Sequence, residues 1–175
     1  MMIENCEKTG SLLLLVDCPE MLSSLPDKSF IKKYPGCFPD CPKLFEDYEG
    51  KVDAINVYSV MHSVFLEASL FDFIDNACRL LNDQGELLIG DIPNISKRKR
   101  FFASKTGIKY HQEFTGRTDQ PKIEFNILER EKIDDAVVFS ILQRYRNASF
   151  DTYLLMQDKK LPMANRREDI LIKKP

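Results

Sequence analysis

Polar side chains follow three apolar segments of the sequence, and they are the first candidates for chemistry. The segments are residues 12–16, 52–60 and 86–90. The side chains at or just beyond their carboxyl ends are Asp17, Tyr58, Ser59, His62 and Asp91. Short apolar runs are typical of buried strands, and an open α/β sheet binds its ligands beyond the carboxyl ends of its strands. We therefore expect these side chains to converge on one cleft.

Asp17 is the candidate with the most defined chemistry. A carboxylate at the end of a strand can accept hydrogen bonds from both hydroxyls of a ribose, as it does in dinucleotide sites. Cys18 and Met21 follow closely and would lie beside an adenosine, although either can equally belong to the core. The competing interpretation of Asp17 is an acid that helps to start the helix after it.

His62 is the candidate catalytic residue, because an imidazole titrates near neutral pH and can act as a general base. The alternative is a positional role, in which His62 lines a pocket without taking a proton.

The elements that would position these residues follow from the spacing of apolar side chains. Residues 69–81 are apolar at helical intervals and form the clearest predicted helix. A turn at 82–85 leads into the strand 86–90, so this helix lies between two strands, as in the crossover unit of a parallel sheet. The other predicted helices are 18–25, 42–49 and 133–145, and the other predicted strands are 30–34, 150–156 and 169–173.

Residues 92–122 have no clear periodicity, and we expect a long loop that acts as a lid or substrate insertion. Within it, Tyr110, His111 and Glu113 are candidates on the substrate side. Solvated loop residues without a specific role are the favoured alternative.

A basic run, Lys97 to Arg100, precedes Phe101 and Phe102 in the same segment. It could contact an anionic substrate such as a phosphorylated sugar or a nucleotide sugar. We favour a charged helix end instead, because such runs usually face solvent.

The composition narrows the class of protein. With 43% hydrophobic and 30% charged residues, the 175-residue chain is predicted to form one globular domain, residues 1–175. A net charge of -2 provides no general attraction for nucleic acid, and no apolar stretch approaches the roughly 20 residues of a membrane helix. Five scattered cysteines predict reduced thiols in the cytoplasm and no metal site.

Three segments resemble the class I S-adenosylmethionine-dependent methyltransferase family. They are LLLLVDCPEML around Asp17, VDAINVYSVMHSV through His62, and LFDFIDNACRLLNDQGELLIGDIP through Asp91. The closing segments FDTYLLMQ and REDILIKKP resemble the last two strands of that fold, which form an antiparallel hairpin. The resemblance covers essentially the whole chain, from the second strand of the family fold onward.

This resemblance implies a doubly wound, Rossmann-like α/β fold with a mostly parallel sheet, a closing antiparallel hairpin and no first strand. It implies S-adenosylmethionine as cofactor and an oxygen of a saccharide or related small molecule as methyl acceptor. The implied cofactor-binding residues are Asp17, Cys18, Met21, Tyr58, Ser59 and His62, and the implied substrate-binding residues are Asp91, Tyr110 and His111. In this family a histidine at the position of His62 often lines the methionine end of the cofactor pocket. The sequence has no Asn-Pro-Pro-Tyr-like run of the kind found in members that methylate base amines.

Family members have a first strand and a glycine-rich loop about twenty residues before the acid. Only sixteen residues precede Asp17. We therefore expect residues 1–10 to be the tail of the helix after that loop, with Gly10 as its stop. A chain truncated in this way is expected to bind cofactor poorly unless the missing part is supplied, for example by a partner strand. A homodimer is a further expectation.

Three hypotheses for function follow. The first is an active methyltransferase of which this chain is a fragment. The second is a catalytically incompetent, methyltransferase-like binding or scaffold subunit. The third is a nicotinamide-dependent sugar enzyme, ranked last because no Tyr-x-x-x-Lys pair occurs.

Overall fold

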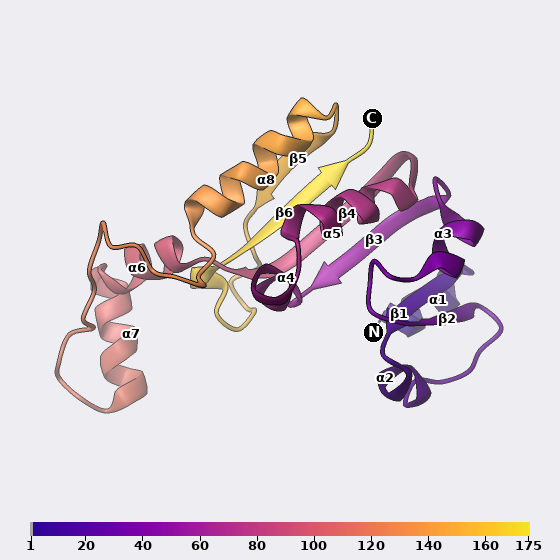
Figure 1. Ribbon diagram of the computed structural model, residues 1–175. Helices are drawn as coiled ribbons and strands as arrows, with labels where there is room; N and C mark the ends of the chain where they lie inside the picture. The colour runs from indigo at the N-terminus through magenta and orange to yellow at the C-terminus, as the bar shows by residue number, and fades with distance from the viewer. Residues whose placement is uncertain (1) are drawn as a thin grey trace. The chain divides into compact units, whose positions relative to one another are not determined.

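A computed structural model describes residues 2–175 as two compact units, one ending at Lys51 and the other running from Val52 to Pro175 (Figure 1). Met1, the first residue of the predicted N-terminal helix, lies outside the described residues. No helix among residues 2–175 combines the length and the apolar character that crossing a membrane would require.

The first unit alternates helices and strands. Its elements are α1 (Met2–Thr9), β1 (Leu13–Asp17), α2 (Pro19–Ser23), β2 (Ile31–Pro35) and α3 (Pro42–Tyr48). The two strands are parallel, with Leu13 opposite Ile31 and Asp17 opposite Pro35. Gly10 follows α1 with a φ of 69°, a conformation that glycine adopts without strain, so its predicted role as a helix stop is confirmed.

The second unit contains a four-stranded sheet with the order β3-β4-β6-β5. Its strands are β3 (Val52–Tyr58), β4 (Leu81–Pro93), β5 (Asp151–Leu155) and β6 (Arg167–Lys173). Strands β3 and β4 are parallel, whereas β6 is antiparallel to both β4 and β5. The predicted α/β fold with parallel strands and a closing antiparallel hairpin is confirmed.

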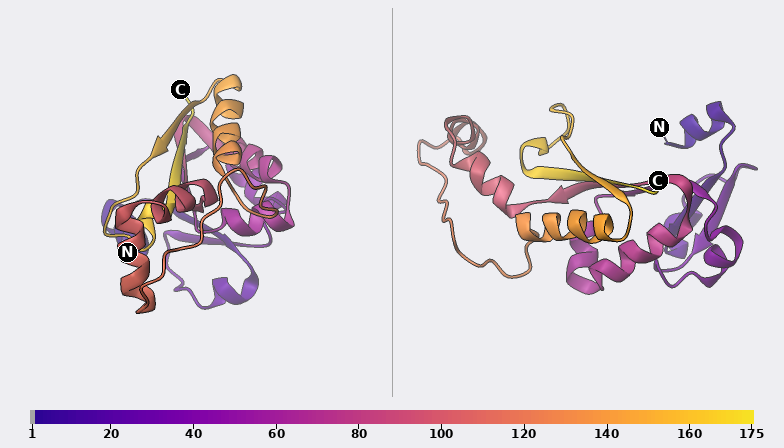
Figure 2. Two further views of the ribbon diagram at one scale, coloured as in Figure 1. Left: turned by 90° about the vertical axis from the view of Figure 1, so that its left-hand side faces the viewer. Right: turned by 90° about the horizontal axis from the view of Figure 1, so that it is seen from above.

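The helices of this unit are α4 (Met61–Glu67), α5 (Leu70–Leu80), α6 (Ile95–Phe102), α7 (Lys105–Thr115) and α8 (Asp135–Asn147), with a short 3-10 helix, η1 (Ala164–Arg166). Helices α4, α5 and α8 lie along one face of the sheet (Figures 1 and 2). The strand side chains on that face are the core of the unit, at 1% exposure or less: Leu87, Ile89, Ile170 and Ile172. Because side chains alternate across a strand, Gly90 and Asp169 belong to the opposite face.

Helix α5 forms where the apolar spacing predicts it. The Ser69 hydroxyl caps its first turn by accepting a hydrogen bond from the Asp72 amide, and the helix ends as β4 begins. Its buried face consists of Phe73, Ile74, Ala77, Cys78 and Leu80. The helix connects the parallel strands β3 and β4, so the predicted crossover unit is confirmed.

The predicted turn at 82–85 is wrong, and a helix before it was not predicted. Residues 82–85 are not a separate turn, because β4 already begins at Leu81 and these residues form an irregularity in its pairing with β3. Gln84 there has a φ of 69°. Helix α4 was also not predicted, because Met61–Glu67 has few polar residues to mark a helical face.

The segment 92–122 is not a structureless loop, since it contains α6 and α7. Both helices begin at side-chain caps: Asn94 accepts from the Lys97 amide and Ser104 accepts from the Gly107 amide. Side-chain caps of this kind are short sequence signals that the search for apolar periodicity overlooked.

Candidate functional site

The carboxyl ends of β3 and β4 meet where Tyr58 is paired with Gly90. A Cβ atom added to Gly90 would lie 2.4 Å from the Tyr58 Cδ2 atom and 2.7 Å from Cε2, far inside van der Waals contact. Only glycine therefore lets the Tyr58 ring lie against the backbone of β4. The ring stays partly open to solvent, with 43% of the residue exposed.

Ser59 follows Tyr58, and Asp91 follows Gly90. Both residues adopt the left-handed conformation, with φ values of 61° and 57°. The Ser59 amide donates to the Gly90 carbonyl at 3.0 Å, and the Ser59 hydroxyl donates to Asp91 Oδ2 at 2.9 Å. Non-glycine residues in this conformation cluster at functional sites, because the surrounding structure must hold them there.

Asp169 on β6 connects this pair to the closing hairpin. Its Oδ1 atom accepts the Asp91 amide at 2.8 Å and the Gln157 side-chain amide at 2.8 Å. Arg167, two residues earlier, directs its Nε atom toward Asp91 Oδ1 at 3.6 Å. Ser59, Asp91, Gln157, Arg167 and Asp169 thus form one polar cluster, which we call the strand-end cluster.

The electrostatic balance of the strand-end cluster is acidic, with two carboxylates facing one guanidinium. Burial and then the charges of Asp91 and Asp169 raise the pKa of the Tyr58 phenol, and Arg167 opposes them. The phenol is therefore held neutral beside the cluster. Such a cluster can bind hydrogen-bond donors.

The connection between β5 and β6 contains all three of the buried side-chain polar atoms that have no hydrogen-bond partner in residues 2–175. They are Gln157 Oε1, Asn165 Oδ1 and Arg166 Nη1. Gln157 is only 7% exposed. Buried polar atoms are normally paired, so this concentration beside the strand ends indicates a place where a bound molecule or water completes the hydrogen bonding.

Asp17, Cys18 and Met21 lie together in the first unit, at the carboxyl end of β1 and in the turn of helix that follows. Asp17 Oδ1 accepts a hydrogen bond from the Cys18 amide at 2.7 Å. Cys18, not Asp17, is the N-cap of α2, and it makes no side-chain cap bond. Asp17 and Met21 are exposed, with Met21 at 55%. The role of all three in binding cofactor stays a prediction.

His62 lies in the first turn of α4 and is exposed. Within residues 2–175 its imidazole has no hydrogen bond, so the structure gives no base-orienting partner of the kind found beside a catalytic histidine. The strand-end cluster contains Ser59 and Asp91 of the predicted residues, with Tyr58 beside it.

Tyr110 and His111 lie on α7, in an aromatic cluster instead of a solvated loop. Tyr110 packs against Phe101 and Phe102 with ring centroids 5.8 and 6.3 Å apart, and its ring stacks on Phe114. His111 approaches Asp119 at 3.9 Å. Glu113 is exposed, 3.8 Å from Lys109. Within residues 2–175, no hydrogen bond or ion pair joins Tyr110 or His111 to Asp91, and their substrate role also stays a prediction.

The basic run lies in helix α6, with Lys99 and Arg100 in its last turn, but Lys97, Lys99 and Arg100 are ion-paired, whereas the favoured interpretation expected a charged helix end that faces solvent. Lys97 is paired with Glu168 at 2.9 Å and Lys99 with Glu129 at 2.5 Å, and Arg100 is paired with Asp135. These ion pairs attach α6 to β6, to the α7–α8 connection and to the first residue of α8. The run is therefore largely occupied in holding the fold together.

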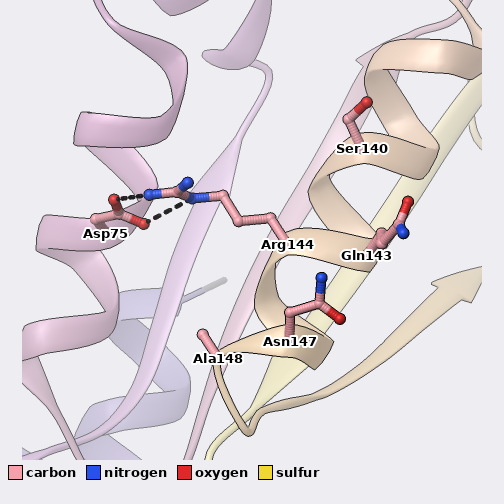
Figure 3. A pocket seen from close by; sticks show the side chains of 6 residues that line it. All are labelled: Asp75, Ser140, Gln143, Arg144, Asn147 and Ala148. Atoms are coloured by element: carbon pink, nitrogen blue, oxygen red, sulfur yellow. Dashed lines mark hydrogen bonds and ion pairs between the residues drawn. The ribbon is translucent and has the colours of Figure 1, made fainter.

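A shallow groove of about 550 Å³ lies between α5 and α8, lined by Asp75, Ser140, Gln143, Arg144, Asn147 and Ala148 (Figure 3). Arg144 bonds Asp75 through Nη2 at 2.5 Å and through Nε at 3.3 Å. Its guanidinium also covers the Phe71 ring at 4.9 Å. The charged groups of this groove are thus paired with each other, and we interpret them as a clamp between the two helices.

Sequence reasoning missed Gln157, Arg167 and Asp169. Asp169 is the first residue of the predicted strand 169–173, and Arg167 lies two residues before it in a run of charged residues, Arg166 to Asp169, which is typical of a solvated strand start. Gln157 lies just after a predicted strand, as Asp17 and Asp91 do, and that position was the available signal. Within the described residues, no group of three or more His, Cys, Asp or Glu side chains is arranged to hold a metal ion.

No protein-family profile matches the sequence, and no curated protein matches it. Solved structures do match. A candidate O-methyltransferase from Nostoc punctiforme superposes with a TM-score of 0.52 at 14% identity, over 93% of this chain and 44% of its own length. The CurJ carbon methyltransferase gives 0.49 at 13% identity, over 94% of this chain and 49% of its own. A candidate histamine N-methyltransferase from Thermotoga maritima gives a TM-score of 0.47 at 13% identity, over 93% of this chain and 73% of its own length.

The chain has the class I methyltransferase fold, as the resemblance implied. It spans less than half the length of the first two of these solved structures. At such low identity the likeness concerns the fold, and it assigns no substrate to this chain.

Proposed function

We propose that this chain forms part of an S-adenosylmethionine-dependent methyltransferase that methylates an oxygen of a saccharide or related small metabolite. The observation that carries the proposal is the acid at the carboxyl end of β1 in a class I methyltransferase fold. Its support comes from that position, since ligands of open α/β sheets bind beyond such strand ends.

Asp17 fits the ribose of an adenosyl cofactor in its hydrogen-bonding capacity. Only Oδ1 has a hydrogen bond within the described part of the chain, and it comes from the neighbouring Cys18 amide. The exposed Oδ2 atom is therefore available to a hydroxyl. The cofactor would supply a methyl group on a sulfonium. The chain's own task is to hold the donor and the acceptor oxygen aligned and away from water.

On the acceptor side, the proposal uses Asp91 as the substrate-binding carboxylate. Ser59 holds its Oδ2 atom at 2.9 Å, and Arg167 approaches Oδ1. In this proposal Tyr58, Ser59 and His62 remain cofactor-binding residues, with His62 as the candidate catalytic residue, and Tyr110 and His111 remain substrate-binding residues. We place the activity in the cytoplasm, which is compatible with five free cysteines.

A partner is part of the proposal. Within the unit Val52–Pro175, β3 is paired with β4 alone, so its other edge has no strand partner in that unit. An unpaired edge is a template for another strand. We propose that a neighbouring strand, from a second copy or from another protein, covers the edge of β3. Light scattering coupled to size-exclusion chromatography tests this through the mass of the particle.

The test of the cofactor assignment uses the gene product as the cell makes it, purified through a tag at the carboxyl end of the chromosomal copy. Calorimetry with S-adenosylmethionine should give a binding heat for the native protein. Asp17→Asn and Asp17→Ala should each weaken binding by about tenfold or more, roughly 1.4 kcal/mol or more. Glu20→Gln is the matched control, because Glu20 is an exposed acid in the first turn of α2.

Transfer is tested with radiolabelled donor and a panel of nucleotide sugars and small metabolites. Product bearing the label on oxygen supports the proposal. A native protein that gives no heat with the cofactor, yet isolates as a stable complex, supports the alternative of a methyltransferase-like binding or scaffold subunit. Unchanged affinity in both Asp17 variants contradicts the assignment of this residue.

A further inference from the structure

The strand-end cluster has hydrogen-bonding capacity that the protein itself leaves unused. Asp169 Oδ1 accepts two hydrogen bonds, whereas no hydrogen bond to Oδ2 is found within residues 2–175. Gln157 donates through Nε2 to Asp169, and this bond fixes which end of the amide points there. The other end, Oε1, is a buried acceptor without a donor in that part of the chain. The cluster therefore offers acceptors to an incoming molecule.

Arg167 adds weakly engaged donors on the same side. Its Nη1 atom lies 3.5 Å from the Asp91 carbonyl oxygen, and its Nη2 atom lies 3.8 Å from the sulfur of Met163. The first contact is long for an N–H···O hydrogen bond, and the second has a thioether sulfur, which is a weak acceptor. An incoming group that can accept as well as donate therefore suits the cluster better than one that only donates.

This mixture of donors and acceptors distinguishes a hydroxyl from an ammonium. A hydroxyl donates one hydrogen bond and accepts others, whereas an ammonium only donates. Arg167 also offsets part of the negative charge by its approach to Asp91 at 3.6 Å, and its guanidinium repels a nearby cation. The partly exposed ring of Tyr58 lies beside the cluster and offers an aromatic surface to the C–H groups of a polyol ring.

We infer that Gln157, Asp169 and Asp91 bind a neutral polyhydroxylated molecule, with Arg167 donating to one of its oxygens and Tyr58 packing against its ring. The inference rests on the proposed function only for the statement that this molecule is the methyl acceptor. The binding itself requires no cofactor. Gln157 and Asp169, which the sequence did not single out, are its specificity-determining residues.

The test is a titration of the full isotope-labelled chain, without methyl donor, followed by two-dimensional NMR. The probes are myo-inositol and methyl α-D-glucopyranoside as neutral polyols, and cadaverine as a cation that only donates. Either polyol should shift the Gln157 side-chain amide and the backbone amides of Gly90 and Asp91. The dissociation constant of cadaverine, measured from the same amide shifts, should be at least about tenfold larger than that of either polyol.

Two variants examine the acceptors. Gln157→Leu removes the unpaired oxygen together with the Nε2 donor to Asp169 at similar volume, and Asp169→Asn removes the charge while keeping an oxygen. Each should weaken polyol binding by about tenfold. Gln143→Leu and Asp151→Asn make the same chemical changes at exposed positions on α8 and β5, and they should stay within about twofold of the native chain. A thermal melt of each variant separates lost binding from lost folding.

The wild-type titration alone can overturn the inference, whatever the variants do. Shifts confined to residues outside the cluster, tighter binding of cadaverine, or no saturable shift with either polyol would each do so. Cofactor binding that depends on Asp17, combined with absent polyol binding, removes this inference and leaves the proposed function standing. Polyol binding without any cofactor binding removes the proposed function and leaves this inference standing.

Discussion

The backbone amide of Asp91 donates a 2.8 Å hydrogen bond to the carboxylate of Asp169, a residue 78 positions later in the chain. This bond joins the end of β4 to the start of β6. It also supports Asp91 in its left-handed conformation, from which the side chain meets Ser59 and Arg167. Asp169 is therefore the residue on which the geometry of the strand-end cluster depends.

Replacing Asp169 by alanine should destabilise the protein by about 1–3 kcal/mol, because two donors, the Asp91 amide and the Gln157 amide, lose their acceptor in a partly buried site. Asp169→Asn retains an oxygen at this position, so it should lose much less stability than the alanine variant. Urea denaturation at neutral pH measures both variants. Equal stability of the alanine and asparagine variants would contradict this account.

Gly90→Ala should cost about 1–3 kcal/mol, since the added methyl would overlap the Tyr58 ring. If the cost arises from that overlap, Tyr58→Ala should relieve it. A double-mutant cycle therefore should give a favourable coupling between the two substitutions, of at least roughly 1 kcal/mol. Independent, additive effects would mean that the ring does not occupy the space beside Gly90.

Gly107→Ala should disturb the α6–α7 turn more than an ordinary substitution in a helix. The new Cβ atom would lie 2.0 Å from the carbonyl oxygen of Phe101, which is backbone and cannot rotate away. We expect a loss of at least about 1–3 kcal/mol. Hydrogen exchange should locate faster exchange in α6 and α7. Gly116→Ala provides a comparison, because at Gly116 the cost comes from a φ of 67° without any overlap.

Asp75 should make the stability of the second unit fall on acidification. Burial pushes the pKa of its carboxyl up, but hydrogen bonds from Arg144 and Tyr145 and the charge of Arg144 push it down by more, so the net pKa is lowered from 3.8. The folded state therefore prefers the ionised form. The stabilisation is complete above the unfolded pKa and is lost as the pH falls through the lower, folded pKa.

Thermal melts of the native protein and of Asp75→Asn, taken between pH 2 and pH 7, check this expectation. The native protein should be the more stable of the two near neutral pH, and the difference should shrink below about pH 4. Asp72→Asn, on the same helix, is the control. If the stability difference between the native protein and Asp75→Asn does not change with pH, the contact between Asp75 and Arg144 does not contribute to the pH dependence.

Much of the fold was predictable because its signals are local. The helix over Leu70–Leu80 follows from apolar spacing, and β1, β3 and the core of β4 follow from short apolar runs. The positions of Asp17, Tyr58 and Asp91 at strand ends follow from the same runs. Helices α6 and α7 were missed because their caps, and not an apolar stripe, mark where they begin.

The sequence by itself determined the α/β class, the order of the strands with the helices α2, α3, α5 and α8 between them, and the placement of acids at strand ends, because each depends on neighbouring residues. Only the tertiary structure decided that Gln157, Arg167 and Asp169 join Ser59 and Asp91. Those contacts depend on the pairing of β6 with β4 across some 78 residues, and on a glycine small enough to admit an aromatic ring. Long-range pairing of this kind leaves no periodic trace in the sequence, since its partners are chosen by the packing of the whole sheet.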